Sequence, residues 1–134
     1  MIGIVIVAHG GLAGEYKSAM EHVVGQQEGV VAIAIRPDDD RAEKQDEICD
    51  AADAVDSGDG VVVAVDMFGG SPSNLSLRAC SPRNRRILYG VNLPLLIKLA
   101  KSRRKSVPEA VEAALKAGRK YIDTHAIPTE SGGH

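Results

Sequence analysis

Two polar side chains follow apolar runs of the sequence at the points where those runs end. His9 comes directly after the run Ile4–Ala8, and Asp66 closes the run Gly60–Asp66. When a carboxylate accepts a hydrogen bond from one imidazole nitrogen, the tautomer is fixed and the other nitrogen keeps a lone pair that can attack phosphorus. The pair therefore predicts a histidine nucleophile that Asp66 orients without reacting itself.

Each member of this pair also has an ordinary structural interpretation. A lone histidine after a strand more often caps a loop, and Asp66 taken alone fits a helix-entry cap or a structural ion pair equally well. What favours the functional interpretation is that both residues are expected at the same edge of one sheet.

A glycine-rich stretch after Asp66 predicts a place for a phosphoryl group. Two glycines and Ser71 precede Pro72, and proline is favoured in a first helical turn, so Ser71 is the expected helix N-cap. Free N–H groups and the positive end of the helix dipole favour an anion there. Glycine after His9 also lets another molecule's backbone approach. The predicted phosphoryl-binding residues are Gly10, Gly69, Gly70 and Ser71.

Three other chemistries use similar residue types. A serine-hydrolase triad of Ser71, His9 and Asp66 is disfavoured because the GxSxG elbow is missing and an N-cap serine uses its oxygen to accept a backbone N–H. The four histidines lack ligand spacing and Cys49 and Cys80 stand alone, so no metal site is expected. The sequence has no GxxxxGK[ST] loop, so neither ATP as a direct donor nor another cofactor is expected.

The elements that must position these residues alternate along the chain. Short runs rich in β-branched residues predict strands, and the first three are apolar nearly throughout, as in strands covered on both faces. These runs are Ile4–Ala8, Val30–Ile35, Gly60–Asp66 and Arg86–Tyr89. Apolar stripes between them predict two helices. The stripes are Tyr16, Met20, Val23 and Val24, then Ile48, Ala51, Ala52 and Val55.

This alternation predicts an α/β fold, with three layers and a doubly wound, mostly parallel sheet. Such sheets bind ligands outside the carboxyl ends of their strands, where the strand order reverses. Two more helices are expected, from Leu93 towards Arg103 and from Pro108 towards Gly118, and Tyr121–Ile127 is expected to form an antiparallel edge strand. Residues 1–127 are predicted to form a single domain, with a flexible tail over 128–134.

Composition narrows the class of protein. A chain of 134 residues with a formal net charge of −2 can bury one core, and its balanced charge gives no reason to bind nucleic acid or an anionic membrane. The first apolar run is too short for a signal peptide or a membrane span, so no membrane insertion is expected. The sequence has two cysteines with no CxxC pair and no disulfide framework, which favours a reducing cytoplasm.

Three clusters of charged residues also have a simple structural interpretation. The acidic run 38–40 shares the sheet edge of His9 and fits either a partner-docking patch or, more simply, a solvated turn and helix start. The basic clusters are interpreted as solvated faces without a function. They are Arg83, Arg85 and Arg86, and Lys101, Arg103, Arg104 and Lys105.

Three motifs together resemble one known family, the enzyme IIA domains of the mannose-type phosphoenolpyruvate-dependent sugar phosphotransferase system (PTS). The segment 4–10 resembles the family's first strand and phosphorylated histidine, 65–74 resembles its second signature, and 90–96 resembles a third. The motifs occur in the family's order, and the resemblance extends from Met1 to Tyr121.

The resemblance implies a mechanism and partners. His9 would be phosphorylated at Nε2, Asp66 would orient Nδ1–H, and Ser71 with nearby amides would contact the phosphoryl group. The donor would be the phosphorylated carrier protein HPr, and the acceptor a IIB component in sugar uptake. Family members form homodimers that exchange a C-terminal strand, here Tyr121–Ile127.

Two positions differ from the family pattern, and one alternative function stays open. Met67 stands where some members have a hydroxyl-bearing residue, and Ser73 stands where an aromatic residue is common. A regulatory protein, in which the phosphorylation state of His9 controls binding to another protein, is the alternative to a transfer protein.

Overall fold

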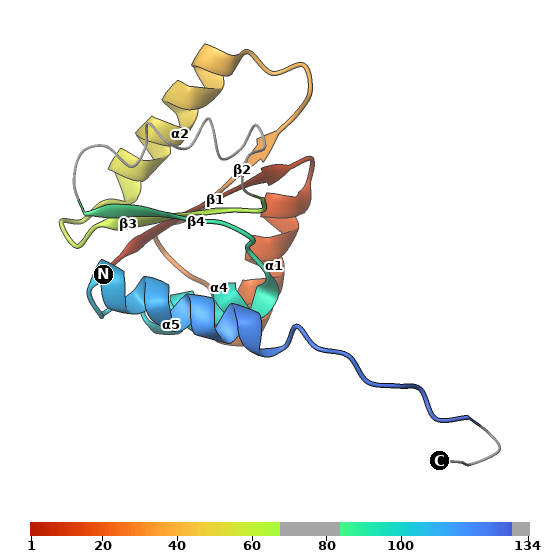
Figure 1. The fold of residues 1–134 in the computed structure, drawn as a ribbon. Helices are drawn as coiled ribbons and strands as arrows, with labels where there is room; N and C mark the ends of the chain where they lie inside the picture. Colours follow the sequence, from red (N-terminus) through yellow and green to blue (C-terminus); the bar gives the residue numbers. More distant parts are fainter. Residues whose placement is uncertain (68–83, 130–134) are drawn as a thin grey trace.

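A parallel β-sheet forms the middle layer of the molecule (Figure 1). The computed structural model describes residues 1–67 and 84–129. Their strands have the spatial order β2-β1-β3-β4. The strands are β1 (Gly3–His9), β2 (Val30–Ile35), β3 (Val61–Val65) and β4 (Arg85–Leu88). The helices are α1 (Leu12–Val24), α2 (Arg41–Val55), α4 (Leu93–Lys101) and α5 (Val107–Lys120).

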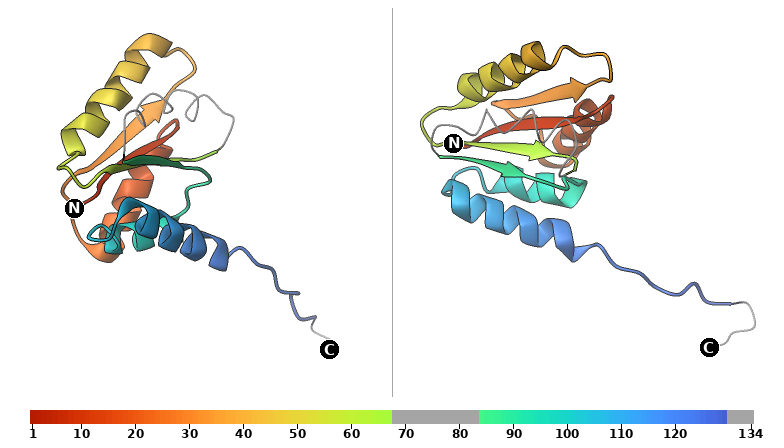
Figure 2. Two further views of the ribbon diagram at one scale, coloured as in Figure 1. Left: turned by 60° about the vertical axis from the view of Figure 1, so that its left-hand side comes forward. Right: turned by 45° about the horizontal axis from the view of Figure 1, so that its top comes forward.

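Helices cover both faces of this sheet, as Figure 1 and both views of Figure 2 show. Helix α2 lies on one face, and α1, α4 and α5 lie on the other. The predicted three-layer α/β fold with a doubly wound parallel sheet is therefore confirmed.

Strand β1 lies in the centre of the sheet and contributes to two separate apolar cores. Ile4, Ile6 and Ala8 belong to the core under α1, α4 and α5, whereas Val5 and Val7 belong to the core under α2. All five side chains are fully buried. Burying one large aliphatic side chain stabilises the fold by about 1.5–3 kcal/mol, so continuous apolar sequence is what a strand with two covered faces requires.

The strand order reverses between β1 and β3. From β1 the chain crosses to β2 on one side and later to β3 and β4 on the other, and all neighbouring pairs are parallel. Two adjacent carboxyl ends from which the chain departs in opposite directions leave a crevice, which is the usual ligand position in open α/β sheets. His9 is the last residue of β1, and Asp66 directly follows β3.

Polar caps define the starts of three helices. Asp40 Oδ1 accepts a hydrogen bond from the Glu43 amide at 3.0 Å and so caps α2. Asn92 caps α4 in the same way, and Ser106 and Glu109 form a reciprocal capping box at α5. The helix start that was expected within 38–40 is thus present.

The predicted apolar stripes are largely confirmed. Ile48 and Ala52 of α2 are buried, and Ala51 and Val55 pack against the same core. On α1, Met20 is buried and two partners of its stripe pack beside it, but the Val23 side chain is 54% exposed. The α1 stripe is therefore narrower than the sequence pattern predicted.

The interpretation of the basic clusters as solvated faces is wrong for Arg103. This residue is only 3% exposed, and its guanidinium donates to the Ile2 carbonyl at 2.7 Å, the Gln27 side chain at 3.2 Å and the Gly29 carbonyl at 3.2 Å. Burial lowers the pKa of Arg103 from its usual value. Charge alone did not reveal that acceptors from two distant parts of the chain, at Ile2 and at 27–29, would converge on this side chain.

Arg85 is a second exception to that interpretation. Its guanidinium lies 2.8 Å from an Asp53 carboxylate oxygen and 3.1 Å from one of Asp56, and its side chain is only 9% exposed. The other members of the two basic clusters that the structure describes are exposed: Arg86, Lys101, Arg104 and Lys105. Arg83 lies outside the described residues.

The expected edge strand over Tyr121–Ile127 is not formed. These residues are exposed and pair with no strand, and the segment runs away from the helical layer (Figures 1 and 2). The physical reason is that a strand needs a neighbour for its backbone groups, and after α5 the chain leaves the sheet instead of returning to the edge at β4. Of the predicted tail 128–134, only 128 and 129 are described, and both are exposed.

Candidate active site

His9 and Asp66 lie in direct contact at the carboxyl edge of the sheet. His9 Nδ1 is 2.9 Å from Asp66 Oδ2, and the same oxygen accepts a hydrogen bond from the His9 backbone amide at 3.1 Å. The structure thus brings together the two residues that the strand ends predicted. They are separated by 57 positions in the sequence.

The carboxylate determines which ring nitrogen is free. Because an ionised carboxylate only accepts hydrogen bonds, Nδ1 of a neutral His9 ring must carry the hydrogen, and Nε2 keeps its lone pair. The His9 side chain is 50% exposed and that of Asp66 only 11%. The nucleophilic nitrogen therefore belongs to an accessible ring that is held by a nearly buried acid.

The second carboxylate oxygen of Asp66 does not contact His9. Oδ1 is buried and has no hydrogen-bond partner within the described part of the chain. Buried polar atoms are usually paired, and those that are not tend to occur at functional positions. The carboxylate thus has one oxygen committed to His9 and another with unused acceptor capacity.

The backbone around His9 is held by the neighbouring strand β2. His9 is in register with Ile35 of β2, and the Gly10 amide donates to the Ile35 carbonyl at 2.9 Å. Gly10 has φ +57°, a left-handed conformation that glycine adopts without strain. This turn lets α1 begin at Leu12 immediately after the reactive ring.

An open pocket of about 410 Å³ lies beside His9. Its lining combines the end of β1 with the loop between β2 and α2. The lining residues are His9, Gly10, Ile35, Arg36, Pro37, Asp39 and Arg41. The acidic run 38–40 was expected at this edge, whereas a role for the two arginines that flank it was not predicted. The available signal was that Arg36 directly follows strand β2, as His9 follows β1.

Asp39 is partly neutralised within this loop. Its Oδ2 accepts a hydrogen bond from the Arg36 backbone amide at 2.7 Å and lies 3.6 Å from Lys44 Nζ. The hydrogen bond from Lys44 to Glu47 is the main reason that the pKa of Lys44 is raised, and Asp39 adds to the effect. Asp38 is exposed and does not line the pocket.

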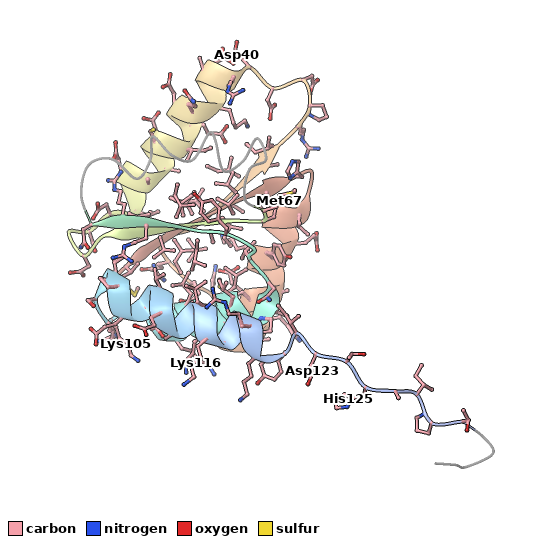
Figure 3. The ribbon with its side chains drawn as sticks, viewed as in Figure 1. Asp40, Met67, Lys105, Lys116, Asp123 and His125 are labelled. Carbon is pink, nitrogen blue, oxygen red and sulfur yellow. The ribbon has the colours of Figure 1, made fainter. Side chains whose placement is uncertain are left out.

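Several predicted site residues lie outside the described residues. Gly69, Gly70 and Ser71, with the helix start expected at Pro72, fall in 68–83, so the phosphoryl-binding stretch stays a prediction. Met67 is described, lies just beyond the end of β3 and is 53% exposed (Figure 3). Among the described residues, no group of three or more histidine, cysteine, aspartate or glutamate side chains is arranged to hold a metal ion.

Comparison with known protein families gives a match over most of the chain. A family model named EIIA-man, described as "PTS system fructose IIA component", matches residues 3–116. The mannose-specific EIIAB component of the PTS of Escherichia coli K12 is 30% identical over 124 residues. The match covers 90% of this chain but 38% of that protein, so the chain spans well under half the length of the curated relatives it matches.

Solved structures of PTS components have the same fold. The EIIA component from Streptococcus agalactiae superimposes with a TM-score of 0.83 at 26% identity, covering 92% of this chain and 97% of that one. A PTS IIA protein associated with the fucose utilization operon of Streptococcus pneumoniae gives 0.74 at 29% identity, covering 85% and 88%. Within the described residues, no helix has the length and apolar character needed to cross a bilayer.

Proposed function

Because this chain belongs to the EIIA-man family of PTS IIA components, we propose that it is a phosphocarrier that accepts a phosphoryl group on His9 and passes it on. The observation that carries this proposal is the contact of 2.9 Å between His9 Nδ1 and Asp66 Oδ2. The contact favours the tautomer with its hydrogen on Nδ1 and its lone pair on Nε2, at the edge of the sheet where an open α/β fold receives ligands.

The proposed transfer needs little covalent help from the protein. The nitrogen–phosphorus bond of the donor breaks and its electron pair stays on the donor nitrogen, while Nε2 of His9 forms the new bond to phosphorus. The product ring carries positive charge and still donates Nδ1–H to Asp66, so the carboxylate stabilises the charge that develops. Phosphoryl transfer depends mainly on such positioning and charge stabilisation.

The proposed donor is phosphorylated HPr, and the proposed acceptor is a IIB component in PTS sugar uptake, working in the cytoplasm. The relatives named EIIAB have a length that this chain covers only in part, which is consistent with an acceptor outside the 134 residues. The expected single domain over 1–127 would provide the carrier. Gly10, Gly69, Gly70 and Ser71 would contact the phosphoryl group.

A reconstitution experiment tests the proposal. The full chain is mixed with phosphoenolpyruvate, enzyme I and HPr, and the phosphorylated residue is located by mass spectrometry under basic conditions. We expect one acid-labile phosphoryl group on His9, absent from His9→Gln. His22→Gln and His125→Gln are matched controls, since both side chains are exposed and lie away from Asp66. Label on another residue would contradict the proposal.

A second stage separates transfer from signalling. Purified IIB is added to the phosphorylated chain, and the loss of label is followed over time. Transfer predicts that the phosphoryl group leaves His9 for IIB. A label that stays on His9, together with an affinity for another protein that depends on phosphorylation, would favour the regulatory alternative instead.

We also propose that the chain forms a homodimer through its C-terminal segment. Tyr121, Ile122 and Ile127 are 66%, 75% and 90% exposed, and β4 has no second neighbour among the described strands. A segment from a second copy could pair with that edge and cover those side chains. Sedimentation of the full chain should give a dimer, and a chain that ends at Lys120 should give a monomer; a monomeric full chain would contradict the proposal.

A further inference from the structure

Two arginines without ion pairs line the pocket beside His9. Arg36 and Arg41 both belong to its lining, and neither makes a salt bridge with a carboxylate in the described part of the chain. Lys44 and Arg85, by contrast, make ion pairs with carboxylates. The pocket thus has two guanidinium groups that no carboxylate of the described residues pairs with.

The sheet register explains why both arginines line the same pocket as His9. His9 and Ile35 are paired across β1 and β2, so Arg36 is the residue that follows directly beside the Gly10 turn. Arg41 is the first residue of α2. His9 has the same strand parity as Val5 and Val7, which face α2, so its ring starts from the side of the sheet where this helix lies.

The only carboxylate in the lining of this pocket offsets the positive charge weakly. Asp39 already accepts from the Arg36 amide at 2.7 Å and lies 3.6 Å from Lys44, while Asp40 is committed to the Glu43 amide as a helix cap. An anion that entered the pocket would therefore meet two guanidinium groups, and the nearest carboxylate of the described lining, Asp39, already has a cation beside it.

We propose that Arg36 and Arg41 bind the phosphoryl group that His9 carries on Nε2, and so hold it on this side of the sheet. The inference rests on the proposed function. A phosphoryl group is dianionic and has three acceptor oxygens, and guanidinium groups match such oxygens with paired N–H donors. These arginines bind the group and do not react with it. Holding it makes phospho-His9 more stable relative to the phosphorylated donor.

An acidic surface of a protein partner would present similar oxygens to these arginines. The two sources differ in a measurable way, because contacts made only while two proteins are docked change the forward and reverse rates equally. Contacts with the phosphoryl group persist after the partner leaves. Only the second kind shifts the equilibrium between phosphorylated HPr and phosphorylated carrier.

The first measurement is therefore the equilibrium distribution of phosphoryl group between HPr and the full chain. It is compared for the wild type, Arg36→Gln, Arg41→Gln and the double variant at one ionic strength. We expect each single change to move the equilibrium towards phospho-HPr by about three- to tenfold, the range for a partly exposed charge-assisted contact. Arg36→Lys should restore part of the loss. Arg104→Gln removes one exposed arginine away from His9 and should leave the equilibrium unchanged.

The second measurement omits the protein donor. Phosphoramidate transfers its phosphoryl group to histidine with release of ammonia, and the rate of His9 labelling is followed by mass spectrometry. The arginine variants should be labelled about three- to tenfold more slowly, while Arg104→Gln matches the wild type. His9→Gln should take up no label at that position.

The outcomes separate this inference from the proposed function. Unchanged equilibrium with slower transfer from phospho-HPr would show that the arginines dock the partner, and would overturn the inference. Normal transfer and normal phosphoramidate labelling in the double variant would overturn it while leaving the proposed function intact. Labelling by phosphoramidate that depends on the arginines, with none from phospho-HPr, would support the inference and refute the proposed donor.

Discussion

The polar side chains at the two ends of the sheet differ in how fully they are paired. At the amino end, the Arg103 guanidinium makes three hydrogen bonds and Arg85 makes two ion pairs. At the carboxyl end, His9 presents an accessible ring, and Asp66 Oδ1 is buried without a partner in the described residues. Arginines occur at both ends, but within residues 1–67 and 84–129 Arg36 and Arg41 at the carboxyl end make no ion pair with a carboxylate.

This contrast indicates which end is built for stability and which for chemistry. A buried polar group without a partner is destabilising by about 1–3 kcal/mol, so the hydrogen bonds and ion pairs of the amino end are expected to contribute to stability. Such local departures are expected at functional positions. Changes at the amino end should therefore alter the free energy of unfolding, and changes at the carboxyl end should alter phosphoryl transfer.

The largest effect is expected from Arg103→Met. Methionine keeps much of the apolar volume but removes every donor to the Ile2 and Gly29 carbonyls. We expect the free energy of unfolding to fall by about 3 kcal/mol, measured by urea denaturation, because hydrogen bonds from a charged donor contribute strongly. The neighbouring exposed residue gives the control: Arg104→Met should change it by less than about 0.5 kcal/mol. Equal losses of unfolding free energy in the two variants would show that the hydrogen bonds of Arg103 do not stabilise the amino end.

An effect of the opposite kind is expected from Asp66→Asn. The amide can place an N–H group towards Nδ1, which favours the tautomer with its hydrogen on Nε2 and removes the nucleophilic lone pair. We expect phosphorylation of His9 to slow by about 10- to 100-fold, while the free energy of unfolding changes by less than about 1 kcal/mol. An unchanged rate in a folded variant would remove Asp66 from the proposed mechanism.

The smallest expected change in the free energy of unfolding comes from Asp56, which lies at the amino end of the sheet and pairs with Arg85 there. Its hydrogen bond from the Gly58 amide is the main cause that lowers the pKa of Asp56, and Arg85 adds to it. Because the folded pKa lies below the ordinary 3.8, the stabilisation is present above that value and is lost as the pH falls through the folded pKa. Asp56→Asn should lower stability by about 1 kcal/mol at neutral pH.

The pH dependence supplies the check on that prediction. Unfolding curves of the wild type and Asp56→Asn should differ at neutral pH and converge in acid below the ordinary aspartate value. Asp53→Asn is the matched control, because its side chain is 70% exposed and should contribute less. A difference that persists unchanged in strong acid would assign the effect to something other than the charge of Asp56.

Features that depend on local pattern were predictable from the sequence. Strand β2 was predicted at its observed bounds, and the other three strands to within one residue at each end, because apolar runs between turn residues mark buried strands. The contact of His9 with Asp66 followed from the rule that adjacent parallel strands end at one edge. No knowledge of side-chain conformations was needed for it.

Features that depend on convergence of distant segments were not predictable. Arg103 and Arg104 are adjacent and chemically identical in the sequence, yet one is buried and the other exposed. The difference arises because carbonyls near Ile2 and Gly29 meet at one point. Likewise, the residues of Tyr121–Ile127 carry no information about whether a neighbouring strand lies within reach of them.

The reactive pair combines the two halves of the doubly wound sheet. His9 comes from the first βαβ unit and Asp66 from the strand that opens the other side, 57 positions later. A polypeptide cut in the exposed turn around Gly58 would separate the nucleophile from its acid, and neither fragment alone would hold the ring in its reactive tautomer. Acid-labile label on His9 would then appear only after the two fragments reassociate, so phosphorylation would measure how far the fold has been reassembled.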